Sequence, residues 1–371
     1  MKRNGSKILA ALAVLLAGLA PAQAYWLTVL SDDLSTNGSA WTYSGVSNST
    51  GQALIRYDSV NQNIHAEWNE TNLLITTGDP YIMIPSRLSR PLARVLTDND
   101  TFRLRATLNL VPGSVANTVE GYQIANIGLY DVSQMGPDRT LSDDWSTNTN
   151  LLRDGSDFVE FNYFIYNAYP GSTITAVIGA HVDGDDDFVY DAGVGSEGAM
   201  GVDHWLPEGT NLYVEVEYFG AATDTLGRVA HCAIYTDPDR TNLLVVNGVT
   251  MSYWTQPLPA ERTFRVTDVA FYNYVQKKWD EGNVTGAGAG TIDDISVEQY
   301  FEPGQIFSNS LQNESIVSTW AAESGTTYYA QFCSNLLEST WATVAVIQAT
   351  SDTLACTNGL NGGWGCYRVT Y

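Results

Sequence analysis

The sequence predicts an all-β fold, in which a large two-sheet sandwich is followed by a small β-sandwich-like module. Apolar and polar residues alternate with a period of two at many places along the 371 residues, and no sustained helical periodicity is present. Turn-forming pairs such as Pro112-Gly113 and Asn247-Gly248 separate the alternating runs. With 44% hydrophobic residues and 21 Tyr, 11 Phe and 10 Trp, the chain has ample material for a large core.

Residues 1–24 have the pattern of a secretory signal peptide. Three basic residues precede the apolar run from Ile8 to Leu19, and Ala22-Gln23-Ala24 supplies a small-residue cleavage site. The alternative is a retained membrane anchor, but the apolar run is short for a membrane span. No later stretch reaches the roughly 18 apolar residues that a membrane helix needs. We therefore expect a secreted, periplasmic or cell-surface protein that begins at Tyr25 and has no membrane span after cleavage.

The first and last strands of the large domain are expected to lie side by side. The opening strand is predicted around Val29–Leu34, and the closing strand over Thr291–Tyr300, after a glycine-rich run. Each contains a pair of acids, Asp32-Asp33 in the first and Asp293-Asp294 in the second.

Further strands are predicted from the same alternation, and Phe102–Leu110 is the clearest of them. The others in the large domain are 123–130, 158–166, 173–178, 212–219, 229–235, 243–246 and 263–274. We expect a sandwich over residues 25–302, a polar linker over 303–314, and a small β module over 315–371 with strands at 315–322, 327–333, 341–347 and 366–371.

Charge excludes one class of partner. The formal net charge is −23, and loss of the three basic residues of the signal would make it −26. A field of this sign repels phosphate backbones, so nucleic acid is not an expected partner, and neutral or cationic partners fit better. A solvated acidic surface is the commoner explanation of such a charge.

Three of the four cysteines lie in the small module, which favours one disulfide there in an exported protein. We favour a bond between Cys356 and Cys366, which would close the Gly-rich loop between them, over a bond between Cys333 and Cys366. Cys232 is interpreted as a buried strand residue. No Cys or His spacing typical of zinc is present.

The large segment resembles the concanavalin A-like lectin/glucanase superfamily, which includes laminin-G-like modules. The similarity lies in Asp32-Asp33-Leu34-Ser35 through Trp41, in Phe158–Phe164, and in Ile292-Asp293-Asp294-Ile295-Ser296-Val297. It implies a jelly-roll sandwich. The tail resembles a small C-terminal module of secreted bacterial proteins, through Trp320–Tyr328, Asn335-Leu336, Trp341 and Tyr367-Arg368-Val369. Fold alone does not give a function.

Two groups of acids are candidates for structural calcium, which takes oxygen ligands. Asp183, Asp185 and Asp187 alternate on a predicted turn, where an exposed acidic hairpin tip is the alternative. Sandwiches of the carbohydrate-binding kind often hold an ion near their first and last strands, and Asp32, Asp33, Asp293 and Asp294 match that arrangement by residue type. If the two strands pair, a cation would relieve the repulsion among these carboxylates.

A glycan-binding face is the leading functional hypothesis. Sugar rings pack on aromatic side chains, while carboxylates and amides bind their hydroxyl groups. The candidates are Trp145, Trp205, Tyr253 and Trp254, with Asp203 beside Trp205 in the sequence. The alternative for each aromatic residue is a place in the core or an anchoring role in a loop.

Catalysis is the second hypothesis. Glycoside hydrolysis needs two carboxyl groups that flank the scissile bond. The Glu-x-Asp-x-x-Glu strand pattern of the glucanases in this superfamily is absent, and the remaining candidates are Glu160, Glu215 and Glu217. The sequence thus favours a non-catalytic protein that binds a polysaccharide or a surface glycan. The alternatives are a divergent glycoside hydrolase or lyase, and a structural protein of the cell envelope.

Overall fold

The structure, a computed structural model, describes most of the chain downstream of residue 24. The described residues are 25–35, 38–45, 54–67, 81–113, 122–134, 157–166, 171–179, 206–220, 227–255, 257–258, 260, 262–278, 289–301, 304, 306–312, 315–333, 341–351, 353–359 and 366–371. The predicted signal peptide lies outside them. Within this part of the chain, no helix is long and apolar enough to cross a membrane.

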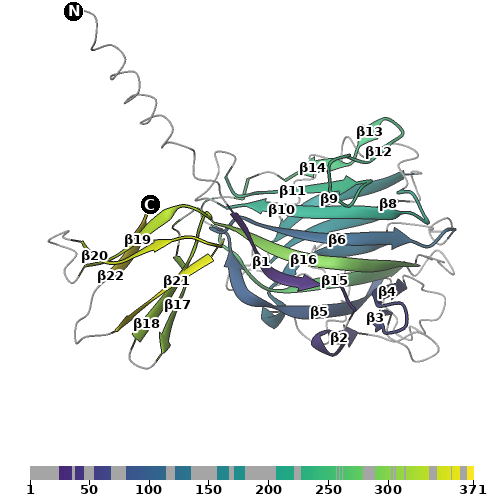
Figure 1. The fold of residues 1–371 in the computed structure, drawn as a ribbon. Coiled ribbons are helices and arrows are strands. Elements are labelled where there is room, and N and C mark those ends of the chain that lie inside the picture. The colour runs from purple at the N-terminus through teal and green to yellow at the C-terminus, as the bar shows by residue number, and fades with distance from the viewer. Residues whose placement is uncertain are drawn as a thin grey trace, which may run out of the picture. The chain divides into compact units, whose positions relative to one another are not determined.

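The chain divides into two compact units. One comprises Thr28–Gln299, and the other holds Tyr300–Tyr371 together with the chain up to Leu27. The first unit is built on two antiparallel sheets, shown in Figure 1, so the all-β sandwich predicted from the sequence is confirmed.

Sheet A has eight strands. Their order is β14 (Ser252–Trp254), β11 (Val229–Tyr235), β10 (Asn211–Phe219), β6 (Phe102–Leu110), β16 (Ala289–Phe301), β4 (Asn63–Glu67) and β3 (Ile55–Asp58), with β1 (Tyr25–Asp32) paired to β16. The first and last strands are therefore neighbours, as the sequence predicted. A two-stranded hairpin, β12 (Val245–Val246) and β13 (Val249–Thr250), precedes β14.

Sheet B has six strands. Their order is β2 (Thr42–Gly45), β5 (Tyr81–Thr97), β15 (Arg265–Lys278), β7 (Tyr122–Tyr130), β8 (Phe158–Tyr166) and β9 (Gly171–Gly179). Two 3-10 turns, Gly38–Ala40 and Val132–Gln134, lie in the connections.

One hydrophobic core joins the sheets. Sheet A contributes every second residue, as in Leu104 and Val216, and sheet B contributes residues such as Phe161 and Phe271. The alternation that predicted the strands is thus the pattern of burial: β6 is buried at each of its even-numbered positions. Cys232 is fully buried in this core, as expected, and burial raises the pKa of its thiol.

The small module consists of two three-stranded sheets around its own core. One has the order β17 (Ile306–Gln312), β18 (Ser315–Ala321), β21 (Thr353–Gly359), and the other β20 (Ala342–Gln348), β19 (Thr327–Cys333), β22 (Cys366–Thr370). Trp320 and Tyr328, both fully buried, form the centre of the core. Two expectations were wrong here, because β17 occupies the predicted linker and β21 occupies part of the predicted Gly-rich loop.

The structure does not contain the disulfide that the sequence favoured. No disulfide joins any two of the four cysteines, all of which the structure describes. Cys356 packs into the module core, while Cys366 lies on the opposite face of its own strand from Val369, which does contact that core. The two thiols therefore point away from each other, so a Cys356–Cys366 bond does not fit this fold.

Candidate functional site

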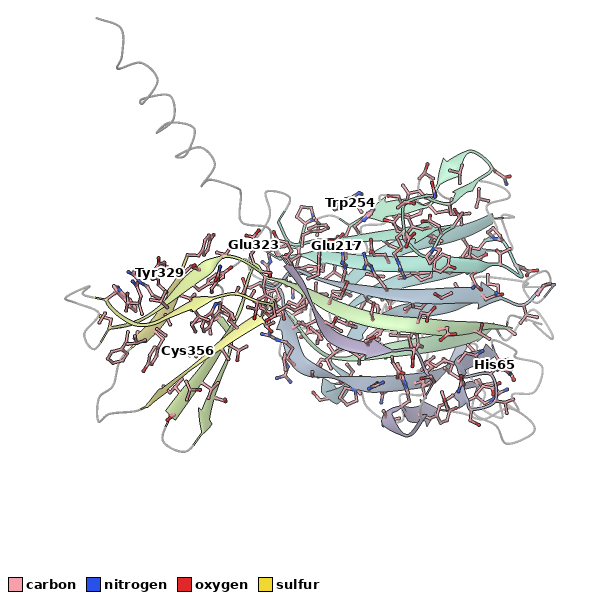
Figure 2. All side chains as sticks on the ribbon, in the orientation of Figure 1. His65, Glu217, Trp254, Glu323, Tyr329 and Cys356 are labelled. Carbon is pink, nitrogen blue, oxygen red and sulfur yellow. The ribbon has the colours of Figure 1, made fainter. Side chains whose placement is uncertain are left out.

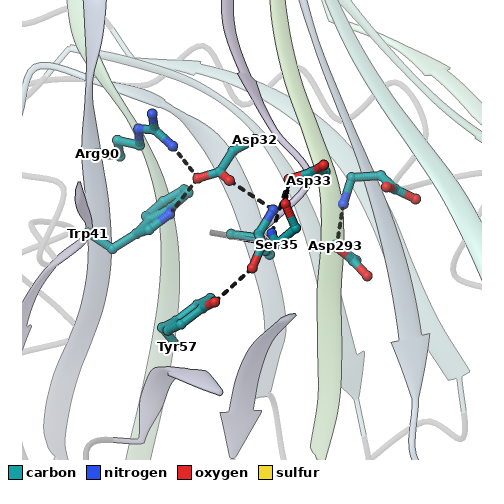
Figure 3. Close-up of polar contacts among 9 residues, drawn as sticks. Asp32, Asp33, Ser35, Trp41, Tyr57, Arg90 and Asp293 are labelled. Carbon is teal, nitrogen blue, oxygen red and sulfur yellow. Dashed lines mark hydrogen bonds and ion pairs between the residues drawn. The ribbon is translucent and has the colours of Figure 1, made fainter. Parts of the chain in front are cut away.

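The acids of the first and last strands meet, but they have different roles (Figure 3). Asp32 accepts hydrogen bonds from the backbone N–H of Leu34 at 2.8 Å and from Trp41 Nε1 at 2.9 Å, and it pairs with Arg90. Its side chain is only 9% exposed. Asp33, in contrast, is exposed and accepts hydrogen bonds from Ser35 N and Oγ, which lower its pKa.

Asp293 and Asp294 occupy a β-bulge, where the pairing of β16 with β6 shifts register. The backbone N–H of Asp294 donates to Asp293 Oδ1 at 2.8 Å. Burial is the largest cause that raises the pKa of Asp293, and the charges of Asp294, Asp33 and Asp32 add to it. These acids are therefore close enough to repel one another, as the sequence suggested.

The arrangement does not fit the calcium site predicted from these four residues. Both oxygens of Asp32 already accept hydrogen bonds from Leu34, Trp41 and Arg90, and Arg90 neutralises its charge. Among the described residues, no group of three or more His, Cys, Asp or Glu side chains is placed to hold a metal ion. The other predicted calcium ligands, Asp183, Asp185 and Asp187, lie outside the described residues.

Asp293→Asn is expected to stabilise the protein at pH 7. The folded state raises the pKa of Asp293, so its protonated form is favoured on folding and that contribution is lost as the pH rises through the folded pKa. Because the residue is partly exposed, solvent screening limits the expected gain to about 0.5 kcal/mol. Denaturant unfolding at pH 7 and at pH 3.5 measures it, and the gain should vanish at the lower pH.

Calcium gives a control for this experiment. The shift in melting temperature on adding calcium, whatever its size, should be the same in the wild type and in Asp293→Asn. A stabilisation by calcium that only the wild type shows would restore Asp293 as a ligand.

The outward face of sheet A, which we call the polar face, carries a row of polar and aromatic side chains. Cross-strand register places Trp254 of β14 opposite His231 of β11, His231 opposite Glu217 of β10, and Glu217 opposite Arg103 of β6. Residues opposite one another in antiparallel strands share a face, and the core residues alternate with them. Figure 2 labels Trp254 and Glu217 on this sheet.

An exposed aromatic stack ends this row. The Trp254 side chain is 41% exposed. Its ring lies nearly parallel to His231, with centroids 4.2 Å apart, and to Phe219, with centroids 5.5 Å apart. The ring of His231 is hydrogen-bonded to Ser252 at 2.8 Å, and burial lowers its pKa against a smaller opposing effect of Glu215. The imidazole is therefore neutral at pH 7, and the stack is a fixed uncharged platform.

Tyr253 does not share this platform, which corrects one expectation. In β14 the side chains alternate, so Tyr253 points into the core, is 9% exposed, and lies beside Met251, with its hydroxyl 3.8 Å from the sulfur. Of the aromatic candidates, Trp145 and Trp205 lie outside the described residues, as does Asp203. Trp254 is the one that the structure places at a surface.

A network of ion pairs continues the polar face. Arg105 pairs with Glu215 at 2.6 Å and with Glu298 at 3.3 Å, and Arg103 pairs with Glu298 at 2.6 Å. The hydroxyl of Tyr235 lies 3.4 Å from Glu215. Burial and the Glu215 charge raise the pKa of Tyr235 to about 12, so this hydroxyl keeps its proton. Sequence reasoning found Glu215 and Glu217 but not the arginines, whose partners lie more than 100 residues away.

Glu160 is a different case, because it lies in sheet B and is buried. It accepts a hydrogen bond from the Tyr130 hydroxyl. Its strand passes close to Gly128, where an added Cβ would lie 2.6 Å from the Cβ of Glu160. The three acids proposed for catalysis are therefore on two sheets: Glu215 and Glu217 are two residues apart on β10, and Glu160 is on β8.

Comparisons with known proteins give fold-level neighbours. No protein-family model matches the sequence. No curated protein matches it either. Among solved structures, it is similar to the basic winged bean lectin bound to Tn-antigen, with 11% identity over 76% of this chain and 100% of the lectin, at a TM-score of 0.37.

Two other solved structures are similar at the same level. The carbohydrate recognition domain of Emp47p has 13% identity over 75% of this chain and 96% of its own, at a TM-score of 0.38. Alginate lyase Aly36B, solved with an alginate trisaccharide, has 10% identity over 75% of this chain and 98% of its own chain, at a TM-score of 0.33. Likeness at this level carries no argument about ligand or reaction.

Proposed function

We propose that this protein is an exported, non-catalytic glycan-binding protein that binds sugar at the Trp254 end of the polar face. The observation that carries the proposal is the stack of Trp254 on His231 and Phe219, at the surface of sheet A. Large exposed aromatic rings next to polar groups are typical of recognition sites.

The chemistry around the stack suits a sugar. An indole face packs against the C–H face of a pyranose, while hydroxyl groups need both donors and acceptors. Ser252 and His231 supply a hydroxyl and a neutral imidazole, and Glu217 supplies a carboxylate one strand further on. The preorganised rings lose little side-chain entropy on binding, which favours affinity.

The net charge narrows the class of glycan. At −23, the chain repels polyanions over a Debye length of about 8 Å at physiological salt. Acidic polysaccharides are therefore weaker candidates than neutral ones. We propose a neutral polysaccharide or a neutral surface glycan as the ligand.

Trp254→Ala is expected to weaken glycan binding by about tenfold or more, as for an aromatic residue at the centre of a binding site. The measurement is affinity electrophoresis against soluble neutral glucans, mannans, xylans and galactans, with alginate and pectin as acidic comparators. Trp254→Phe should retain part of the affinity.

Tyr329→Ala is a matched control for this variant. Tyr329 lies in the small module and is 41% exposed, like Trp254 (Figure 2). Its removal should leave binding unchanged. If the wild type binds none of the polysaccharides, the proposal is wrong. If the wild type and Trp254→Ala bind a polysaccharide equally well, the binding site does not include Trp254.

The alternative is a divergent hydrolase or lyase that uses Glu160, Glu215 or Glu217. Glu160 is the best candidate of the three, because its carboxylate is buried next to a tyrosine hydroxyl, whereas Glu215 is paired with Arg105. Buried carboxyl groups next to a hydroxyl group are candidates for acid–base chemistry. Incubation of the same polysaccharides should release no reducing ends and no unsaturated products. If the wild type releases either product and Glu160→Gln does not, the protein is an enzyme and the proposal of a non-catalytic binding protein is wrong.

A further inference from the structure

We propose that Cys333 and Cys366 are the site of a cross-strand disulfide, which closes the small module after export. The proposal concerns a modification of the module and does not depend on the glycan site. Its basis is the register of β19 and β22, which places Cys333 directly opposite Cys366.

Side-chain contacts on both faces fix this register. On one face, the rings of Phe332 and Tyr367 lie 5.0 Å apart. On the other, Arg368 Nε donates to Gln331 Oε1 at 2.7 Å. Both contacts join residues that the register places opposite each other. Because side chains alternate, the next pair on the Gln331–Arg368 face is Cys333 with Cys366.

The geometry of antiparallel strands suits a disulfide at this pair. Residues directly opposite have Cα atoms about 4.5 or 5.5 Å apart, depending on the hydrogen-bonding pattern. Disulfides span about 4.4 to 6.8 Å between Cα atoms, so neither strand needs to move. The two Cβ atoms also point to the same side of the sheet, as the bond requires.

The other cysteines are poorly placed to compete. Cys356 lies in the other sheet of the module, opposite Ser318 of β18, and packs into the core. Cys232 is fully buried in the large unit, where burial raises the pKa of its thiol and keeps it protonated.

Exposure sets the order of the reaction. Cys366 is half-buried, whereas Cys333 is 2% exposed. The thiolate of Cys366 attacks the disulfide of an oxidant, such as oxidised glutathione or a protein disulfide, and releases one thiolate. The thiolate of Cys333 then attacks the Cys366 sulfur and releases the second. Two thiols lose two protons and two electrons, and the oxidant is reduced to two thiols.

The bond would support a weak part of the module. β22 is a five-residue edge strand that pairs with β19 alone, and a unit of this size gains substantially from a covalent staple. It would close a loop that contains β20 and β21, so two more strands would be held within the covalent ring.

Thiol counting tests the proposal on the full chain. The purified protein is equilibrated with oxidised and reduced glutathione, denatured, and alkylated with N-ethylmaleimide. Intact mass should show two labels, and four after prior reduction. Peptide mapping without reduction should show Cys333 joined to Cys366. Four labels without reduction, or any link that includes Cys356 or Cys232, overturns the proposal.

Stability supplies a second readout. Reduction should lower the melting temperature of the wild type by about 5 to 10 °C for a unit of this size. Cys366→Ser should melt at the lower temperature and show no further change on reduction. Cys356→Ser is the control. It should keep the Cys333–Cys366 disulfide, and its melting temperature should still fall on reduction. If the wild type melts at the same temperature with and without reductant, the disulfide does not stabilise the module. The mass measurement uses only the wild type, so it does not depend on whether any variant folds.

Discussion

Asp32→Ala is expected to destabilise the large unit by about 3 to 4 kcal/mol. Asp32 has three partners in the folded state: the Leu34 N–H, the indole N–H of Trp41, and the Arg90 guanidinium. Removing the carboxylate leaves a buried indole donor unpaired and leaves a partly buried cation without its anion. The turn also loses support, because Leu34 has a positive φ of 55° and Asp32 caps its N–H.

Urea unfolding of the wild type and the variant measures this effect. Asp32→Asn keeps an acceptor for Leu34 and Trp41 but loses the ion pair, so we expect a smaller loss of about 1 to 2 kcal/mol. The control is the neighbouring acid, since Asp33 is exposed and bonds only Ser35 in the described structure. Asp33→Ala should cost less than about 1 kcal/mol. Equal costs at the two positions would contradict the structural role assigned to Asp32.

This pair of aspartates shows how far the sequence could predict the site. Asp32 and Asp33 are adjacent and of the same residue type, so the sequence treats them alike. Only the direction of each side chain distinguishes them, since Asp32 is buried and Asp33 is exposed. The sequence placed them correctly beside Asp293 and Asp294, because first and last strands of a sandwich pair. It did not show that Arg90, 58 residues away, already neutralises Asp32. For that reason Asp32 does not fit the calcium site that the sequence predicted from these four acids.

Strands were predictable where alternation was strong and uninterrupted. β6 and β11 have the predicted bounds, because every second residue of each packs into the core. β5 was missed, since Pro85 and Pro91 argue against a strand. The pairing of β5 explains why it tolerates both prolines. β2 pairs only with residues 86–89 of β5, so Pro85 and Pro91 lie beyond the hydrogen bonds between these two strands. On the β2 side, the prolines have no partner among the described residues, and no local sequence pattern shows this.

The aromatic candidates show a similar limit. The sequence analysis named both Tyr253 and Trp254 as candidates because they lie in or beside a loop-like stretch. Alternation along β14 places Tyr253 in the core and Trp254 at the surface. The type of a side chain predicts what it can bind, but the face of the strand on which it lies determines whether it is exposed to a ligand. β14 has only three residues, too few for the sequence to show which of them alternate into the core.

The second large effect is expected from Arg105→Ala, at about 2 kcal/mol. Arg105 joins Glu215 and Glu298 across three neighbouring strands of sheet A, and Glu215 is 7% exposed. Without the guanidinium, Glu215 keeps the long contact to the Tyr235 hydroxyl and becomes a largely buried anion. Burial is the largest cause that lowers the pKa of Arg240, the Arg105 charge adds to it, and the Glu215 charge opposes it. Arg240 is therefore close enough to Glu215 for its charge to compensate in part and reduce the loss.

Arg56→Ala is the matched control, since Arg56 pairs with Glu67 at 2.8 Å on the same sheet and the two side chains are 28% and 25% exposed. A pair of this exposure is worth less than about 1 kcal/mol. The double variant Arg105→Met with Glu215→Leu should recover most of the lost stability, because apolar groups of similar volume leave no buried charge. If that double variant is no more stable than Arg105→Ala alone, the unpaired Glu215 carboxylate is not the cause of the lost stability. The ion-pair network would then contribute little to the stability of sheet A.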